Sequence, residues 1–206
     1  ATMQVLAVDE ALIIVCKPAG LLSVPGRLPE NKDCLITCLQ AEFADALTVH
    51  RLDQVTSGLM VFARSKAAQA HLSAQFAQRL VHKRYTAWVE GHVLEDSGSI
   101  DLPLICDWPN RPRQKVDFVD GKPALTHWRV LERSEAVAPR TLLELTPVTG
   151  RSHQLRLHLA SIGHPIVGDD FYGAQPAARV CLHASELGLS HPNTGVAMQW
   201  QSAAPF

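Results

Sequence analysis

Short apolar runs separated by polar or turn-forming residues recur along this chain of 206 residues. Alternation of apolar and polar positions is typical of a strand with one buried face, and a short uninterrupted apolar run is typical of a strand buried on both faces. On this basis we predict the following strands: Val5–Val8, Leu12–Cys16, Leu59–Ala63, Lys83–Val89, Pro123–Glu132, Thr141–Pro147, Ala184–Leu189 and Val196–Gln201.

Two segments have apolar residues at helical spacing. We predict one helix that Asp33 caps and that runs to about Ala44. Ser65 caps a second helix from Lys66 to about Leu80, and its buried stripe is formed by Leu72, Phe76 and Leu80.

The segment from His153 to Ile162 fits two structures. Its leucines alternate as in a strand, yet they also fit one face of a helix. Ser152 as a cap and Gly163 as a stop favour the helix. Arg151 and Ser152 then lie at an electropositive helix end, which suits an anion.

Strands outnumber helices, the two kinds of element mingle, and no repeat or linker interrupts them. This pattern predicts one α+β domain over residues 1–206, with a mixed, largely antiparallel sheet flanked by helices and loops.

Composition narrows the class of protein. Hydrophobic residues make up 47% of the chain and charged residues 19%, and the net charge is −1, which excludes a wholly basic surface but not a local basic stripe. The five cysteines form no C-x-x-C pair, so we expect reduced thiols and no zinc site. Without a leader or a long apolar run, we expect a soluble cytoplasmic protein.

Asp53 is the only acid between Ala46 and Val89. Nearby positive charge keeps a carboxyl group ionised and also attracts polyanions. Asp53 is therefore either a catalytic carboxylate in a surface that holds a phosphate backbone, or a structural residue that pairs with Arg51 or opens a turn. The surrounding basic residues are Arg51, Arg64, Lys66, Arg79, Lys83 and Arg84.

Two further basic features are candidates for a site. Residues 108–115 contain two prolines and the bases Arg111, Arg113 and Lys115 but no acid, so they form either an exposed phosphate-binding loop or a solvated one. Lys17 follows a predicted strand as either a solvated loop charge or a site-lining residue. The chain has no phosphate loop, dinucleotide fingerprint, acyl-transfer serine elbow or deaminase signature, which leaves aspartate chemistry without a cofactor.

Together these segments resemble the RluA family of pseudouridine synthases, over nearly the whole chain. The matching motifs are Lys17-Pro18-x-Gly20, His50-Arg51-Leu52-Asp53 with Thr56-Ser57-Gly58-Leu59, Lys83-x-Tyr85-x-Ala87-x-Val89-x-Gly91, Gly150-Arg151-x-His153-Gln154-Leu155-Arg156-x-His158, Gly163-His164-Pro165-Ile166-x-Gly168-Asp169, Leu182-His183-Ala184 and His191-Pro192.

The resemblance implies a role for each matched residue. Asp53 would be the catalytic carboxylate, which either attacks C1′ of the uridine or removes the 2′ proton. Tyr85 would stack on the flipped base, and Arg151 would pair with Asp53. The remaining candidates would bind the substrate: Arg51 would fill the gap left by the base, Leu155 would pack near it, and His50 and Thr56 would contact the RNA. From the basic loop we expect Arg111, Arg113 and Lys115 to contact phosphates.

Residues 20–27 and 102–112 resemble a branch of the family that modifies both a hairpin of large-subunit (23S) ribosomal RNA and the anticodon stem-loop of some tRNAs. The resemblance implies no cofactor, no metal and a monomer. Many family members begin with a small S4 RNA-binding domain, and this chain begins at the catalytic domain, so we expect its own loops to select the target.

Two other functions remain open. A hydrolase acting on a glycosidic bond is expected to need a second carboxylate, for which Asp169 or Asp170 would be recruited. A non-catalytic RNA-binding module that kept the fold would bind RNA without isomerising it.

Overall fold

The computed structural model describes residues 3–26 and 34–206. The predicted cap Asp33 and the end of the 20–27 motif lie outside these ranges. The chain divides into two compact units, one made of Ala1–Lys83 and His183–Pro205 and the other of Arg84–Leu182 with Phe206.

The first unit is built on a sheet whose strands follow the order β1-β2-β4-β11, with β12 beside β11 and β3 beside β4. The pairing of β4 with β11 is parallel, and the other pairings are antiparallel. β4 is buried at every position, as its unbroken apolar run predicts, whereas the edge strand β1 alternates. The strands are β1 Gln4–Val8, β2 Leu12–Lys17, β3 Leu47–Thr48, β4 Ser57–Ala63, β11 Leu182–Ser190 and β12 Ala197–Gln201.

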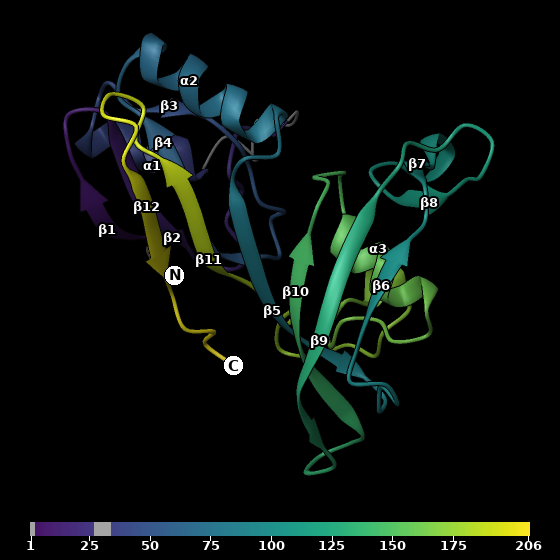
Figure 1. Ribbon diagram of the computed structural model, residues 1–206. Helices are drawn as coiled ribbons and strands as arrows, with labels where there is room; N and C mark the ends of the chain where they lie inside the picture. The colour runs from purple at the N-terminus through teal and green to yellow at the C-terminus, as the bar shows by residue number, and fades with distance from the viewer. Residues whose placement is uncertain (1–2, 27–33) are drawn as a thin grey trace. The chain divides into compact units, whose positions relative to one another are not determined.

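Helix α2 (Lys66–Ala77) lies against this sheet, where it contacts β3 and β4 (Figure 1). The predicted cap is confirmed, because the Ser65 side chain accepts a hydrogen bond from the Ala68 N–H. The helix ends earlier than predicted, since Arg79 adopts a left-handed φ of 58°. Leu80, predicted to be buried, is therefore 65% exposed.

Helix α1 spans Leu35–Glu42 and ends two residues before the predicted end at Ala44. Its N-cap residue is Cys34, which makes no side-chain capping hydrogen bond. Leu35 and Leu39 are fully buried, so packing, not capping, holds this helix in place.

The second unit has an antiparallel sheet in the order β5-β10-β9-β6. The predicted strands of this region are confirmed, but β6, β7 and β8 were not predicted because they are short or rich in polar residues and glycine. The elements are β5 His82–Glu90, β6 Ser97–Asp101, β7 Leu104–Cys106, η2 Trp108–Asn110, β8 Gln114–Val116, β9 Leu125–Ser134, β10 Arg140–Pro147, α3 Gln154–Ser161 and η3 Asp170–Tyr172.

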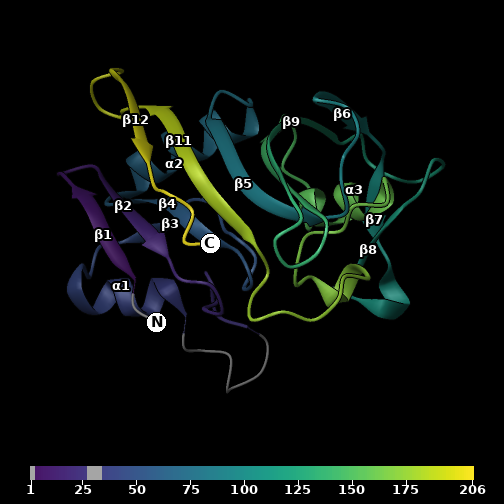
Figure 2. The ribbon, with the colours of Figure 1, turned by 90° about the horizontal axis from the view of Figure 1, so that it is seen from below.

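The ambiguous segment near residue 155 is the helix α3, which contacts β9, β10 and η3. The β7–β8 hairpin and α3 lie near one another in the second unit (Figure 2). The Gln114 N–H of β8 donates to the hydroxyl of Tyr172 in η3 at 3.0 Å. Ser152 is not the cap that we predicted: the N-cap residue is His153, with a left-handed φ of 53° and no side-chain capping bond. The fold class, a mixed and largely antiparallel sheet with helices, is confirmed. The assignment of residues 1–206 to one catalytic domain stays a prediction.

Within the described ranges, no helix has both the length and the apolar character needed to cross a membrane.

The glycine that starts β4 provides a test of packing in the first unit. Gly58 has a φ of +125°, and a Cβ there would overlap the backbone of Ala184 on the parallel neighbour β11. We expect Gly58→Ala to lower the free energy of unfolding by about 3 kcal/mol or more, measured in urea.

Gly163→Ala is the matched control, because Gly163 has a φ of +84° but nothing within 4 Å of the added Cβ. Its loss should be only about 1 kcal/mol. Equal losses in the two variants would show that the close approach to Ala184 is not what requires glycine at position 58.

Candidate active site

Asp53 lies in the turn that leads into β4. Its carbonyl oxygen accepts a hydrogen bond from the Thr56 N–H at 3.0 Å. Thr56 is 3% exposed and so lies in the interior of the first unit, whereas Asp53 is partly exposed and Arg51 is exposed. The turn therefore presents a carboxylate and a guanidinium two residues apart.

The residue after Asp53 is held by a buried lysine. Lys17 is 0% exposed, and its Nζ donates to the carbonyl oxygens of Pro18 at 2.9 Å, Leu21 at 2.5 Å and Gln54 at 3.0 Å. Gly20 reinforces the link, since its N–H donates to the Gln54 carbonyl oxygen at 2.7 Å. The alternative of a solvated loop charge for Lys17 is wrong, because its ammonium group is buried and joins two loops; a site-lining role stays a prediction.

The residue before Asp53 is held by a buried serine. The Ser23 hydroxyl donates to the Leu52 carbonyl oxygen at 2.8 Å and accepts from the Leu52 N–H at 3.1 Å. The backbone on both sides of Asp53 is thus fixed to residues 17–23. The motif around Lys17 signalled this region, but no pattern distinguished Ser23 from an ordinary loop serine.

His50 is bound into the first unit by its ring. Nε2 accepts a hydrogen bond from the Val61 N–H at 3.1 Å, and the ring stacks on Phe76 with centroids 4.4 Å apart. Burial, with a smaller effect from the Lys83 charge, lowers the pKa of His50 to about 3. The imidazole is therefore neutral at physiological pH and carries its proton on Nδ1.

Lys83 is one of the basic residues around Asp53 in the sequence, but the pattern did not predict that it is largely buried. Burial lowers the pKa of its ammonium group. It precedes Tyr85 by two residues on β5, so the two side chains leave the same face of the strand. Tyr85 is half-buried and lies opposite Leu145 in the pairing with β10.

In the second unit a buried glutamine positions Arg151. Gln154 Oε1 accepts from the Arg151 N–H at 3.1 Å and from the Thr149 hydroxyl at 2.6 Å. The Arg151 side chain is held as well, because its Nε donates to the Pro123 carbonyl oxygen at 3.0 Å. Leu155 follows on α3 and is 7% exposed.

The same glutamine anchors a chain of neutral hydrogen bonds between α3 and β9. Its Nε2 donates to Thr126 Oγ1 at 3.0 Å, and Thr126 bonds to His158 Nδ1 at 2.9 Å. His158 Nε2 donates to the Leu102 carbonyl oxygen at 2.9 Å. Burial lowers the pKa of His158, so its ring is neutral. Each side-chain polar atom of Gln154, Thr126 and His158 in this network has a hydrogen-bond partner.

Asp169, one of the two carboxylates that a hydrolase could recruit, is committed elsewhere. It is 1% exposed and receives two hydrogen bonds from the Arg156 guanidinium, at 2.8 and 2.9 Å. A bidentate buried pair of this kind engages both oxygens of the carboxylate. Asp170 is exposed at the start of η3.

Residues 108–115 are more structured than predicted, because they include η2 and part of β8. Most of them are exposed, as expected, but their bases have protein partners. The Arg111 guanidinium lies 4.2 Å from the centroid of the Trp108 ring, and the Arg113 guanidinium lies 5.3 Å from that of Tyr172. Lys115 is exposed, and its charge helps to lower the pKa of Asp117.

The structure groups the predicted site residues within each unit. The first unit holds His50, Arg51, Asp53 and Thr56, and the second holds Tyr85, Arg111, Arg113, Lys115, Arg151 and Leu155. The joint action of Asp53 with Tyr85 and Arg151 stays a prediction.

Among residues 3–26 and 34–206, one group of potential metal ligands lies close together: Asp9, Glu10 and His191. The Asp9 carboxylate already accepts bonds from the backbone of Ala11 and Leu12 and from His191 Nε2. This cluster therefore serves to join two turns of the first unit.

The comparisons with known proteins agree on one family. A family model described as RNA pseudouridylate synthase matches residues 11–161. The chain is 50% identical over 209 residues to the dual-specificity RNA pseudouridine synthase RluA of Yersinia pestis, covering 99% of this chain and 100% of that protein. It is 48% identical over 208 residues to the protein of the same name from Escherichia coli K12, covering 99% and 94%.

Solved structures give the same result. Human RNA Pseudouridylate Synthase Domain Containing 1 matches with a TM-score of 0.84 and 28% identity, over 100% of this chain and 84% of that one. Human RNA Pseudouridylate Synthase Domain Containing 4 matches with a TM-score of 0.78 and 26% identity, over 98% and 88%. The resemblance noted from the motifs is confirmed, and the chain belongs to the RNA pseudouridylate synthase family, whose members are isomerases that act on RNA.

Proposed function

We propose that the protein converts specific uridines of large-subunit ribosomal RNA and of tRNA anticodon stem-loops to pseudouridine, with Asp53 as the catalytic carboxylate. The identity of 50% to a dual-specificity enzyme over nearly the whole chain supports the two substrates. The observation that carries the assignment of Asp53 is the fixing of its two neighbours, by Ser23 and by Lys17. Pre-organisation of this kind is what a reacting group requires.

The reaction rearranges one nucleotide without adding or removing an atom. The bond from N1 to C1′ breaks, the uracil turns, and C5 bonds to C1′. The C5 proton then leaves, and N1 ends with a proton. Asp53 starts this sequence either by attacking C1′ or by removing the 2′ proton, and both routes need an ionised carboxylate within a surface that accepts RNA.

The uridine must leave the stack before Asp53 can reach it, which costs a few kcal/mol and least in an unpaired loop. Arg51 is exposed next to the carboxylate and is proposed to fill the gap. Tyr85 is proposed to stack on the flipped base and Leu155 to pack near it. We propose that Arg151 pairs with Asp53, for which its guanidinium keeps further donors beyond the one bonded to Pro123.

His50 has a narrower role than a charged substrate contact. Because Nε2 accepts from Val61, only Nδ1–H is left as a donor for RNA. The positive charge of this part of the first unit comes instead from residues such as Arg51 and Lys83.

The rival functions are less well supported. A hydrolase cannot use Asp169 as its acid without breaking the pair with Arg156, and Asp170 is exposed at the start of η3. A module that only binds RNA gives no reason for the rigid support of Asp53. We further propose that the enzyme acts as a monomer in the cytoplasm, without a metal or cofactor, and that its own loops select the target.

The first test replaces the carboxylate. Asp53→Asn should lower tritium release from [5-³H]uridine RNA by at least about 1,000-fold, because removal of a catalytic nucleophile or base has effects of that size. Both an anticodon stem-loop and a ribosomal hairpin are used as substrates. RNA affinity should change by less than about three-fold.

Asp45→Asn is the control, since Asp45 is an exposed acid of the same unit that pairs with Arg64 at 3.2 Å. It should keep full activity. An Asp53→Asn variant with substantial activity would remove Asp53 from the mechanism. Wild-type binding without tritium release from either RNA would favour the module that only binds.

The second test removes the buried ammonium. Lys17→Met leaves the carbonyls of Pro18, Leu21 and Gln54 without their shared donor, and we expect a loss of about 3 kcal/mol in the free energy of unfolding. The value of kcat should fall more than KM rises, because the turn that carries Asp53 loosens. Lys66→Met, at an exposed position, should change stability by less than about 0.5 kcal/mol. Equal stability of the two variants would contradict the role given to Lys17.

The third test uses pH. The pKa of His50 is about 3 in the folded state and its ordinary value is 6.5, so the unfolded chain binds the extra proton as the pH falls. Stability is then fully present above pH 6.5 and declines below it, by at most about 1.4 kcal/mol per pH unit from this group.

His50→Gln keeps an acceptor for the Val61 N–H but does not titrate, so urea unfolding between pH 7 and 5 should show a weaker pH dependence. An unchanged slope would mean that His50 is not the neutral buried group described above. His158 contributes in the same direction and remains in both proteins.

A further inference from the structure

An exposed tryptophan lies next to an arginine on the β7–β8 hairpin. Trp108 is 62% exposed, and the Arg111 guanidinium lies 4.2 Å from the centroid of its ring. Arg111 Nη1 also donates to the Trp108 carbonyl oxygen at 2.8 Å, which fixes the pair. Since Arg111 covers one face of the ring and the residue is still largely exposed, the other face is open to solvent.

The turn that carries the pair is rigid. The Asp107 N–H donates to the Arg113 carbonyl oxygen at 2.8 Å, and the Asn110 N–H donates to the Asp107 carbonyl oxygen at 2.9 Å. The Asn110 amide also donates to the Asp107 carboxylate at 2.9 Å, so the acid of this turn is already engaged. The hydrogen bonds of this turn thus hold the large apolar ring of Trp108 in a solvent-exposed position.

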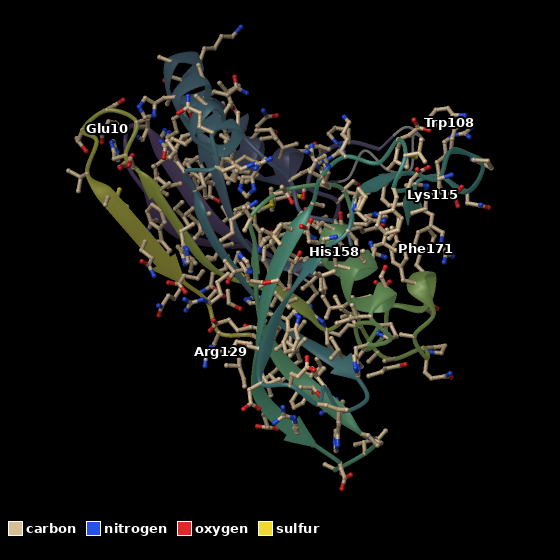
Figure 3. All side chains as sticks on the ribbon, turned by 45° about the vertical axis from the view of Figure 1, so that its right-hand side comes forward. Glu10, Trp108, Lys115, Arg129, His158 and Phe171 are labelled. Atoms are coloured by element: carbon tan, nitrogen blue, oxygen red, sulfur yellow. The ribbon has the colours of Figure 1, made fainter. Side chains whose placement is uncertain are left out.

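The turn is joined to the segment that carries Arg151. The Tyr172 hydroxyl accepts from the Gln114 N–H at 3.0 Å and bonds to His153 Nδ1 at 2.6 Å. Arg113 adds to this link, with its guanidinium 5.8 Å from the Phe171 ring centroid. Trp108, Lys115 and Phe171 lie on the same side of the second unit (Figure 3).

We propose that Trp108 and Arg111 form a stacking platform for one unpaired base of the substrate RNA. The base stacks on the open face of the indole, and the remaining N–H groups of Arg111 contact the neighbouring phosphate. Unpaired RNA bases stack on aromatic rings and on guanidinium planes in this way. The inference rests on the proposed function, and it gives a different role to each of the three basic residues in the segment 108–115.

Arg111 carries the contact to RNA because it is exposed and its guanidinium lies on the ring of Trp108, which is itself 62% exposed. Arg113 is mainly a link, since it packs against Tyr172 and Phe171. Lys115 is exposed and offers a phosphate a single point charge, without a planar group that could stack on a base. A rigid stacking surface suits a loop nucleotide better than a duplex, whose bases are already stacked.

The test is a double-mutant cycle between the protein and the RNA. Stem-loop RNAs carry a single abasic nucleotide, moved in turn through each loop position, and their affinity for each protein is measured on the inactive Asp53→Asn background. One position should show a loss of roughly ten-fold with the parent protein and little further loss with Trp108→Ala, because the stacking contact is already gone. Trp108→Phe should keep most of the coupling.

Salt dependence separates the roles of the two residues. Arg111→Met should reduce the slope of log affinity against log salt by about 0.7, the value for one phosphate on a single strand, and Trp108→Ala should leave the slope unchanged. Leu94→Ala, at a residue that is 90% exposed in the same unit, is the control and should change neither affinity nor coupling.

Equal losses at all loop positions, with no coupling to Trp108, would overturn the platform. The coupling is measured by binding, so it does not depend on turnover. If the wild type releases tritium and the coupling is absent, the proposed function stands and the platform fails. If the coupling is present and no tritium is released, the platform stands as an RNA contact and the proposed function fails.

Discussion

The hydrogen bonds of the buried Lys17 ammonium group are the interaction on which the surroundings of Asp53 depend. A charged group without contact to water is costly unless its hydrogen bonds are met, and here three backbone carbonyl oxygens meet them. Those carbonyls belong to two loops that are far apart in the sequence. The need to satisfy one buried charge therefore fixes the loop after β2 against the turn that carries Asp53.

In the second unit, neutral hydrogen bonds hold the backbone of Arg151 in place. Gln154 has both an acceptor and donors in one side chain, and it uses them to hold the backbone of Arg151 on one side and Thr126 on the other. His158 extends the chain without a charge, since burial lowers its pKa. A neutral network of this kind positions Arg151 without placing a competing charge beside it.

Charge is thus kept where the proposed chemistry needs it. His50 and His158 are neutral because they are buried, and Asp169 and Arg156 cancel each other in a bidentate pair. Asp53, Arg51 and Arg111 remain at least partly exposed. An RNA enzyme that rearranges a nucleotide without a cofactor needs a placed carboxylate and a surface that holds the backbone and bases, and Asp53, Arg51 and Arg111 are groups of these kinds.

The strands and the capped helix α2 could be predicted from the sequence because they depend on local patterns. The unbroken run of β4, the alternation of β5 and the hydroxyl of Ser65 each act within a few residues. The set of motifs that includes the Asp53 segment also indicated the family without any structure, and the family model matches residues 11–161.

Other features were decided only by tertiary structure, since they depend on partners far away in the chain. Leu80 is exposed because Arg79 turns the backbone out of the helix, and Ser152 is not a cap because the chain enters α3 through a left-handed His153. Lys17 and Ser23 hold the neighbours of Asp53 across 37 and 29 residues of sequence, respectively. Sequence patterns therefore predicted a candidate for the catalytic carboxylate, and only the fold decided what holds its neighbours in place.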